Sequence, residues 1–472
     1  MEKQNSLSAS TAWYSLGNFF VRSISFILIP LYSNFLTTGE YGNYALLMSL
    51  YALIAVFYQS GMQSGLTKFY LEVGQVEQRS KVFSTVFNSV IMLGFFLSLV
   101  LIVFAQNISV LLLGSGVYKN LIVLLSVSLF TDTLGYFALQ LLKTKEKAKK
   151  VVQLSGISSL INLALNIILV YYLKWKIEGI LWAQLGSSLI LILILLPSIL
   201  PELRLSIDKT FLKKLIIFSL PLMVSGLFAS AVDVSDRFIL DVFTTKNEVG
   251  IYSLSYKIAL VMNVFVISFR TAWAPYGLNL FYKNEYTQTF GLTLKKYIAA
   301  SCLILLVITL FAHYLFEINI AGFSLVNKSY ESGLIILPFV LMGYLFNGLA
   351  SFYSIYSLAS SKSYHFLISD GLAFIINIGL NFLLIPIFGM LGAAISTTAA
   401  FIAAAFYLFV ISFKKIKVDY PLKEIIITLA AAVLILFAGM AYKVLVFEII
   451  LIISYVIIVW SFAKVKLTGF FS

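Results

Sequence analysis

Charged residues interrupt several long apolar stretches of this sequence, and these are the residues most able to do chemistry there. A charge at the centre of a hydrocarbon layer is costly, so it usually faces a cavity or a partner. Two of these residues are Arg22 and Arg270, and paired guanidinium groups match the oxygens of a phosphate or pyrophosphate through bidentate hydrogen bonds. We expect both to bind an anionic group, unless buried acids neutralise them or they extend to the membrane surface. Lys257 is a further candidate with the same two interpretations.

A run of acids surrounds another arginine in the sequence Asp233-Val-Ser-Asp236-Arg237-Phe-Ile-Leu-Asp241. Asp233, Arg237 and Asp241 are four residues apart, so they share one helical face and can pair with each other. Asp236 lies about 100° round the helix and is then the acid without that partner. The strip is either a neutralised structural feature or the source of an acid that binds a proton or a sodium ion during a conformational cycle.

Two isolated acids and two prolines complete the set of candidate residues. Asp132 and Asp370 lie inside apolar stretches, where each either faces a cavity or has a polar partner. Pro221 and Pro275 free backbone carbonyls inside their stretches, so both are expected hinges. The two histidines lack metal-ligand spacing and there is one cysteine, so no metal site and no cofactor are expected.

Apolar helices are the elements that must position these residues. The 472 residues are 61% hydrophobic and 11% charged, with a mean hydropathy of +0.99, whereas soluble proteins average about 25% charged residues. The long runs can each cross a hydrocarbon core of about 30 Å, and they are continuously apolar, unlike the strands of a β-barrel. We expect an all-α polytopic membrane protein with about fourteen transmembrane helices. Their predicted positions are 10–36, 41–67, 82–107, 117–142, 150–173, 178–200, 213–241, 248–281, 288–316, 329–360, 363–386, 389–412, 423–442 and 445–463.

Basic residues predict the orientation of these helices, because short loops rich in lysine and arginine stay in the cytoplasm. With a cytoplasmic N-terminus, that side holds the dense clusters at 143–150 and 414–417. Both termini are therefore expected in the cytoplasm. The net charge of +13 is expected to contact anionic lipids rather than nucleic acid. The opposite loops hold only Lys119, Lys174, Lys176, Lys246, Lys328 and Lys443.

An internal repeat divides the chain into similar halves. Residues 35–46 and 243–254 share two threonines, an acid and a Gly-x-Tyr turn, and the pattern Asn-x-x-x-Asn recurs at 162–166 and 377–381. Helices one to six thus correspond to helices seven to twelve. Because six is even, both halves enter the membrane in the same sense, which gives a parallel repeat. The expected parts are an N-terminal lobe at 1–203, a C-terminal lobe at 204–417, and the appended helices thirteen and fourteen at 418–472.

Several motifs resemble a known family. The turn Gly39-Glu-Tyr-Gly42, the run Asp236-Arg237-Phe-Ile-Leu240 and the segment Arg270-Thr-Ala-Trp-Ala-Pro275 are similar to sequences of the polysaccharide-export branch (O-antigen flippases of the Wzx type). That branch belongs to the multidrug/oligosaccharidyl-lipid/polysaccharide (MOP) flippase superfamily. The resemblance implies two MATE-like six-helix lobes around a cationic cavity that opens alternately to each face. It also implies that Arg22 and Arg270 contact a pyrophosphate, with Lys68 as a third contact.

The resemblance implies a function as well. The implied function is that of a flippase that moves an undecaprenyl-pyrophosphate-linked oligosaccharide from the cytoplasmic to the outer leaflet of a bacterial inner membrane. The product would enter surface polysaccharide biosynthesis, with a polymerase and glycosyltransferases as further partners. Alternatives in the same superfamily are a lipid II flippase, whose relatives concentrate arginines in helices one, two and eight, and a cation-coupled multidrug exporter. A membrane polymerase or ligase would need a large loop with clustered catalytic groups; the loops here are short, so no enzyme is expected.

Overall fold

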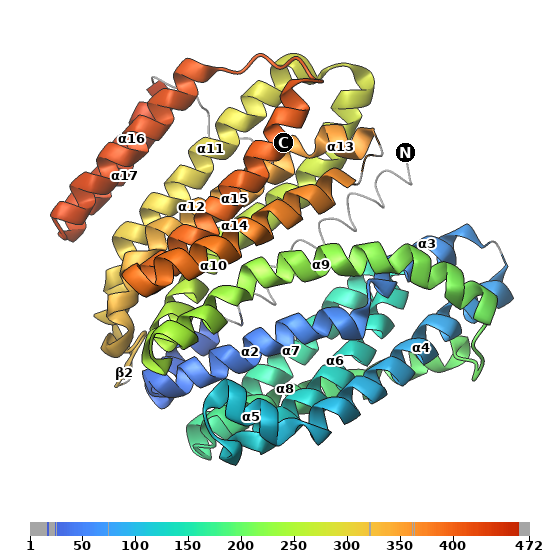
Figure 1. Cartoon of the computed structure of the whole chain (residues 1–472). Helices are drawn as coiled ribbons and strands as arrows, with labels where there is room; N and C mark the ends of the chain where they lie inside the picture. The colour runs from blue at the N-terminus through green and yellow to red at the C-terminus, as the bar shows by residue number, and fades with distance from the viewer. Residues whose placement is uncertain are drawn as a thin grey trace. The chain divides into compact units, whose positions relative to one another are not determined.

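The computed structural model describes residues 17, 24, 26–73, 75–320, 322–360, 362 and 364–461, and there the chain is almost entirely helical (Figure 1). A first helix at Phe26–Phe35 precedes the labelled elements. These are α2 (Thr38–Gln59), α3 (Met62–Glu72), α4 (Val76–Val103), α5 (Ala105–Leu113), η1 (Gly116–Tyr118), α6 (Lys119–Thr144), α7 (Ala148–Asn166), η2 (Ile167–Tyr172), α8 (Lys176–Ile199), η3 (Leu200–Glu202), α9 (Lys209–Phe243), α10 (Lys246–Lys283), α11 (Tyr286–Phe311), η4 (Ala312–Phe316), β1 (Asn319–Ile320), β2 (Phe323–Ser324), η5 (Lys328–Ile336), α12 (Leu337–Tyr353), α13 (Ile355–Ala359), α14 (Tyr364–Phe388), α15 (Met390–Phe413), α16 (Leu422–Ala441) and α17 (Leu445–Ser461).

Twelve helical stretches of the described residues are long and apolar enough to cross a membrane, and Phe26–Phe35 and Leu445–Ser461 are shorter apolar helices. The chain is therefore a multi-pass membrane protein, and the prediction of about fourteen helices is confirmed. Several helices begin before their predicted apolar segments; α4 starts at Val76, although residue 82 was expected. Polar residues at a membrane surface can remain helical, so hydropathy alone underestimates helix length.

Contacts between elements divide the chain into two compact units, Met1–Phe238 and Ile239–Ser472. The division falls inside α9, because the N-terminal part of α9 packs on the first unit. The lobe boundaries predicted from the repeat, at 203/204 and 417/418, stay a prediction.

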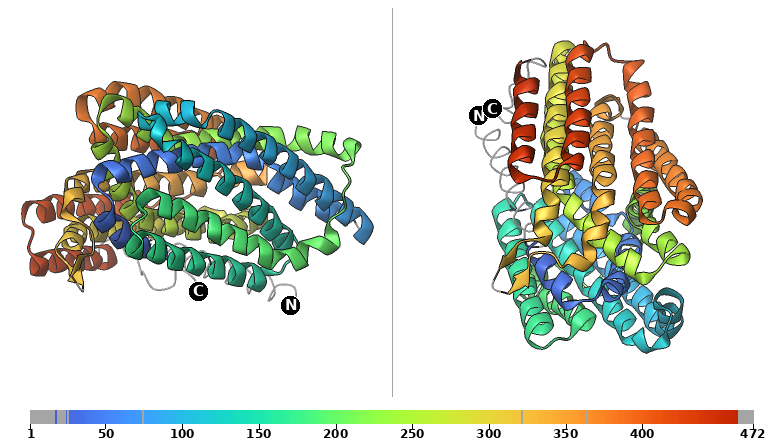
Figure 2. Two further views of the ribbon diagram at one scale, coloured as in Figure 1. Left: turned by 90° about the horizontal axis from the view of Figure 1, so that it is seen from below. Right: turned by 90° about the vertical axis from the view of Figure 1, so that its left-hand side faces the viewer.

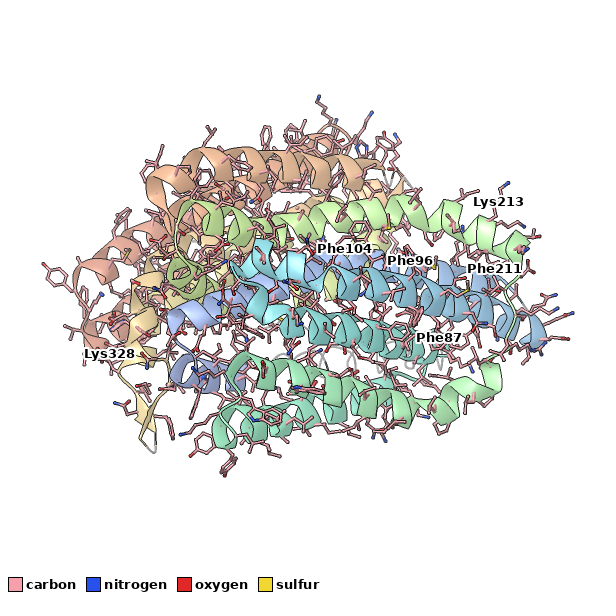
Figure 3. The ribbon with its side chains drawn as sticks, turned by 60° about the horizontal axis from the view of Figure 1, so that its bottom comes forward. Phe87, Phe96, Phe104, Phe211, Lys213 and Lys328 are labelled. Atoms are coloured by element: carbon pink, nitrogen blue, oxygen red, sulfur yellow. The ribbon has the colours of Figure 1, made fainter. Side chains whose placement is uncertain are left out.

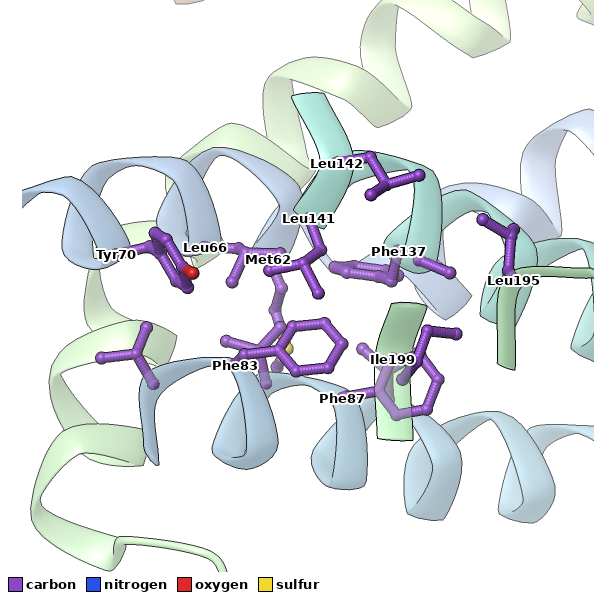
Figure 4. Close-up of a cluster of buried hydrophobic side chains, with 14 of the residues drawn as sticks. Met62, Leu66, Tyr70, Phe83, Phe87, Phe137, Leu141, Leu142, Leu195 and Ile199 are labelled. Atoms are coloured by element: carbon purple, nitrogen blue, oxygen red, sulfur yellow. The ribbon is translucent and has the colours of Figure 1, made fainter. Parts of the chain in front are cut away.

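A buried hydrophobic cluster forms the core at one end of the first unit (Figure 4). Phe83 and Phe87 of α4 stack on each other, with ring centroids 5.2 Å apart. Around them lie Leu66 of α3, Phe137 of α6 and residues of α7, α8 and α9, all in the same cluster. Side chains from six helices thus fix this end of the unit.

Two glycines allow α3 to approach α9 closely. The helix is interrupted between α2 and α3 at Ser60 and Gly61, whose φ angles are 48° and 66°. A Cβ on Gly61 would lie 2.5 Å from the backbone oxygen of Ser219, and one on Gly65 would lie 3.0 Å from the Ser219 hydroxyl. Only glycine fits this backbone angle and this contact. The spacing Gly61-x-x-x-Gly65 thus permits a close contact between α3 and α9.

The repeat predicted from the two turns is visible in each unit. Thr37 and Glu40 form a capping box at the start of α2, and the Thr245 side chain accepts from the backbone N–H of Glu248 at the start of α10. After each Asn-x-x-x-Asn pattern, a glycine of the next helix approaches the preceding one. A Cβ on Gly179 would lie 3.2 Å from the Leu169 backbone, and one on Gly392 would lie 2.8 Å from the Ile385 nitrogen.

The outer surface of α4 is apolar, as a lipid-facing helix requires. Phe96 and Phe104 are 60% and 53% exposed, whereas Phe87 is buried. Figure 3 labels these three side chains; Phe104 directly follows the last residue of α4.

Helices α16 and α17 lie beside α11 within the second unit (Figure 2). The Tyr455 hydroxyl donates to the backbone oxygen of Ala299 over 3.0 Å. Glu448 of α17 is 1% exposed and lies 3.9 Å from Nδ1 of His313. Polar contacts of α17 therefore reach both α11 and the η4 turn that follows it.

Candidate functional site

Arg270 projects from α10 and is held by the last turns of α12. Its Nε donates to the Ser351 hydroxyl and its Nη2 donates to Oδ1 of Asn347, both over 2.8 Å. The Ser351 hydroxyl in turn donates to the backbone oxygen of Asn347 over 3.2 Å. Asn347 and Ser351 are uncharged, so these two contacts orient the guanidinium without adding negative charge.

An aromatic block makes the support of Arg270 rigid. Trp273, one turn further along α10, stacks on Phe352 at 4.7 Å between ring centroids, and its indole N–H donates to the Phe352 backbone oxygen over 3.2 Å. Phe269 packs on Tyr297 of α11 at 4.4 Å. The buried Tyr297 hydroxyl donates to the backbone oxygen of Leu345 over 2.9 Å. Aromatic stacking and these hydrogen bonds fix α10 against α12 on both sides of Arg270.

The other predicted cations are not brought together with Arg270 by the described contacts. Arg22 lies outside the described residues. Lys257 is partly buried on α10, thirteen residues before Arg270, which is about 20 Å along the helix. A single pyrophosphate is far shorter than that distance, so the two side chains cannot share one.

Lys68 lies in the first unit, near the end of α3. It is 3.9 Å from Glu72, and its ammonium lies 4.4 Å from the ring centroid of Phe218. Its side chain is 46% exposed. This is a cation with an acidic and an aromatic neighbour near a helix end, and its role as a phosphate contact stays a prediction.

Asp132 lies where three helices of the first unit meet. The Tyr51 hydroxyl of α2 and Nε2 of Gln184 in α8 both donate to Oδ2 of Asp132, the latter over 2.7 Å. Asp132 is thirteen residues into α6, or about 20 Å from its N-terminal end, which is near the middle of a helix that crosses a hydrocarbon core of about 30 Å. A carboxylate at this depth, held by two neutral donors, is the kind of group that can exchange a proton or bind a cation.

The pairing predicted for the acids of α9 is wrong in two respects. Arg237 forms an ion pair of 3.0 Å with its neighbour Asp236, which is fully buried, and donates to the backbone oxygen of Asp233. Asp241 pairs with Lys246 over 2.6 Å. Burial explains the difference. An isolated buried carboxylate is costly, and the long arginine side chain is flexible enough to reach the adjacent residue.

Asp370, Pro221 and Pro275 are three further predicted residues, and each lies within a long helix. Asp370 is partly buried in α14, six residues or about 9 Å from the helix start. Pro221 and Pro275 lie inside the continuous helices α9 and α10. Pro221 is flanked by Ser219 and Met223, which meet Gly61 of the kinked α2–α3 break. The hinge roles stay predictions.

Each of the two asparagine pairs forms hydrogen bonds both within the pair and to a neighbouring helix. Asn166 donates to Asn162 and accepts from the Tyr32 hydroxyl over 2.8 Å. Asn377 donates to the Thr397 hydroxyl over 3.2 Å. Within the described residues, no cluster of three or more histidine, cysteine, aspartate or glutamate side chains could hold a metal ion.

Sequence reasoning did not identify the residues that hold these charged groups. Asn347 and Ser351 are four residues apart in an apolar segment, and that spacing on one helical face was the available signal. Tyr51 and Gln184 gave no comparable signal. Neutral polar residues are frequent in membrane helices, and only the packing of α2 and α8 shows that they meet Asp132.

Known proteins similar to this chain agree with the fold described above. A family model described as "Polysaccharide biosynthesis protein" matches residues 7–280. No protein with curated information matches the chain. Among solved structures, the chain is similar to lipid II flippase MurJ in an inward closed conformation, with a TM-score of 0.75 and 17% identity over 95% of this chain and 98% of that chain.

Two further structures show the same architecture. An inward-facing multidrug resistance MATE family transporter of the MOP superfamily has a TM-score of 0.69 and 14% identity, covering 84% of this chain and 94% of that one. A MOP superfamily transporter from Pyrococcus furiosus has a TM-score of 0.62 and 14% identity, covering 86% and 95%. These sequence identities are too low to transfer a substrate, but the structural similarity confirms the expected MATE-like fold. Because the family model matches more than half of this chain, the chain belongs to the polysaccharide biosynthesis protein family.

Proposed function

We propose that this protein is a flippase for an undecaprenyl-pyrophosphate-linked oligosaccharide, which it moves from the cytoplasmic to the outer leaflet for surface polysaccharide biosynthesis. Family membership supports the link to polysaccharide biosynthesis. The observation that carries the proposal is Arg270, whose guanidinium is oriented by Asn347 and Ser351. A fixed guanidinium is suited to phosphate oxygens, because its planar fork matches two of them at once.

The depth of Arg270 agrees with a headgroup taken from the cytoplasmic leaflet. Helix α10 has 38 residues and is about 57 Å long, well beyond a hydrocarbon core of about 30 Å. With its first residue at the outer surface, as the basic-residue distribution predicts, Arg270 lies about 36 Å from that end. This is close to the cytoplasmic boundary of the hydrocarbon, where the phosphates of a lipid-linked sugar lie.

The remaining steps follow from the chemistry of such a substrate. Arg270 and Arg22 would hold the pyrophosphate, with Lys68 as a third contact, while the sugars occupy a hydrophilic cavity and the polyprenyl chain stays in lipid. The cavity would open alternately to each face of a bacterial inner membrane, with Pro221 and Pro275 as hinges and both termini in the cytoplasm. A polymerase and glycosyltransferases would be its partners in the pathway.

Asp132 favours a coupled transport cycle. Its carboxylate is held by Tyr51 and Gln184 at mid-depth in the first unit. Proton or sodium binding there would weaken its hydrogen bonds to both donors. That change could loosen α6 from α2 and α8 and so favour one conformation. Asp233, Asp236, Arg237 and Asp370 are further candidates for coupling or gating.

Two other functions of the same superfamily remain alternatives. A lipid II flippase would also use arginines for pyrophosphate, and the chain shares its fold with the lipid II flippase MurJ. A cation-coupled multidrug exporter would need a cavity dominated by acids, which Arg270 opposes. Growth after depletion distinguishes a lipid II flippase from the proposed polysaccharide flippase. Loss of a lipid II flippase stops cell-wall synthesis, whereas loss of a polysaccharide flippase removes only the surface glycan.

The proposal is tested in a deletion strain complemented with variants of the full chain. Arg270→Ala should abolish surface polysaccharide and cause lipid-linked oligosaccharide to accumulate on the cytoplasmic face. Its protein level should match the wild type in membranes. Lys213→Ala is a matched control, because it removes an exposed cation from α9 (Figure 3). Full complementation by Arg270→Ala would refute the phosphate role.

A further inference from the structure

Residues 203–208 connect η3 to α9 as a non-helical strap, and side chains of α4 bind its backbone. The Ser84 hydroxyl accepts from the backbone N–H of Arg204 over 2.8 Å, and it donates to the backbone oxygen of Glu202, the last residue of η3, over 3.0 Å. One hydroxyl therefore holds the chain on both sides of Leu203. Leu203 itself packs against the hydrophobic cluster of the first unit.

Two further side chains of α4 bind the rest of the strap. Nδ2 of Asn88 donates to the backbone oxygens of Arg204 and Ser206, over 2.8 and 3.2 Å. The Thr85 hydroxyl accepts from the backbone N–H of Asp208 over 3.2 Å. A non-helical segment must find partners for its backbone groups outside its own hydrogen-bond ladder. Here α4 provides them along the whole length of the strap.

The start of the strap is also fixed by an ion pair. The Glu202 carboxylate accepts from the Ser80 hydroxyl over 2.8 Å and forms an ion pair with Lys145. Both charged side chains are largely buried, with exposed fractions of 14% for Glu202 and 24% for Lys145. Such a pair is screened by water much less than one on the open surface. Residues of α4 and α6 thus hold the end of η3 together.

The other end of the strap is the first cap of α9. Oδ1 of Asp208 accepts from the backbone N–H of Phe211 over 3.0 Å, and the Asp208 backbone oxygen accepts from Leu212 over 2.8 Å. A side-chain cap of this kind stabilises the start of a helix. Because the N–H of Asp208 is bound by Thr85, one residue links the cap of α9 to α4.

We propose that the strap is a permanent tie, which makes the start of α9 move with α4 throughout the transport cycle. The lobe boundary predicted from the repeat, at 203/204, lies inside the strap, where a flexible linker would let the two lobes separate. The division found from contacts lies inside α9 instead, at 238/239. With the strap closed, any bending between the two units takes place beyond Asp208.

Hydrogen exchange of the full chain in detergent tests whether the strap is closed. The backbone amides of Arg204 and Asp208 should exchange at least about tenfold more slowly than in an unstructured peptide, because the strap must open first. Ser84→Ala should accelerate both amides by about five- to tenfold, the effect of losing one hydrogen bond. The effect at Asp208 is the decisive one, since Ser84 does not bond to it directly.

Ser89→Ala is the matched control for this measurement. Its hydroxyl also belongs to α4 but donates to the Thr85 backbone oxygen of the same helix over 2.7 Å, so exchange in the strap should not change. Unprotected strap amides in the wild type, or an unchanged Asp208 amide in Ser84→Ala, would overturn the inference. If Ser84→Ala does not fold, Thr85→Val takes its place, with the Arg204 amide as the distant reading.

A reversible cross-link tests whether the tie stays closed during transport. Asn88→Cys and Ser206→Cys are combined in a Cys302→Ala chain, and a short bifunctional thiosulfonate joins the two thiols; loss of free-thiol labelling measures the yield. The cross-linked chain, reconstituted in proteoliposomes, should move the substrate of the proposed function as fast as the same chain after reduction. Asn88→Cys alone, treated with the same reagent, controls for modification. A slower rate that a reductant restores would overturn the inference.

Failure of the tie is distinguishable from failure of the proposed function. If the reduced chain moves the lipid-linked oligosaccharide and the cross-linked chain does not, only the tie is wrong. If neither the wild type nor the reduced chain moves that substrate, the proposed function is wrong. Hydrogen exchange then decides the tie alone, because it needs no substrate: protected strap amides support it, and unprotected amides refute it.

Discussion

Removing one of the two side chains that donate a hydrogen bond to Asp132 tests whether this carboxylate is ionised. Tyr51 and Gln184 both donate to Oδ2 of Asp132. Tyr51→Phe deletes the phenolic donor and leaves the ring in place. A second variant, Asp132→Asn, keeps the shape of the Asp132 side chain but removes its charge. The two changes together form a double-mutant cycle around one hydrogen bond.

The expected magnitudes follow from the charge on the acceptor. A hydrogen bond to a charged group contributes about 1.5–3 kcal/mol, whereas neutral interhelical bonds in membranes average about 0.6 kcal/mol. Tyr51→Phe should therefore lower the free energy of unfolding by about 2 kcal/mol in the wild type. In the Asp132→Asn background the loss should be about 0.6 kcal/mol. The coupling between the two changes is thus expected to exceed about 1 kcal/mol.

Reversible unfolding in mixed micelles at neutral pH provides the assay. The same cycle at a pH low enough to protonate the carboxylate should lose its coupling, because both backgrounds then carry a neutral acceptor. Additive effects at neutral pH, with coupling below about 0.3 kcal/mol, would mean that Asp132 is not an ionised acceptor of Tyr51. The coupling role proposed for it would then lack its physical basis.

Two further predictions concern the fold and its orientation. Gly61→Ala should destabilise the protein by about 2–4 kcal/mol in the same unfolding assay, because a Cβ there meets the Ser219 backbone at a left-handed residue. Gly114→Ala, with φ 75° and open space around it, should cost only the backbone strain of about 1–2 kcal/mol, and equal costs would refute the close contact. A cysteine placed at residue 117 in a Cys302→Ala chain should react with an impermeant reagent added outside intact spheroplasts, whereas one at residue 147 should react only after lysis; the opposite pattern would invert the orientation.

Much of the architecture could be predicted because membrane helices follow local rules. Continuous apolar runs are visible in the sequence, and the capping threonines at Thr37 and Thr245 recur because both turns begin helices in the same way. These features depend on nearby residues in the chain.

The sequence predicted the charged residues of the candidate sites but not the side chains that hold them. Arg270 and Asp132 could be found because a charge in an apolar run needs an explanation. Their partners on other helices, such as Asn347 and Gln184, depend on how helices rotate against each other. The pairing of Arg237 with Asp236 depends on a side-chain conformation, so the spacing of charges along α9 predicted the wrong partner.

Translocation by purified protein in proteoliposomes tests the central claim most directly. The measurement follows an undecaprenyl-pyrophosphate-linked oligosaccharide from one leaflet to the other, with access to a lectin or a glycosidase as the reading. The wild type should expose the glycan on the opposite face. Arg270→Ala, reconstituted at equal amounts, should reduce the rate at least about tenfold. Equal rates for the wild type and Arg270→Ala, or no movement of this substrate by the wild type, would contradict the account.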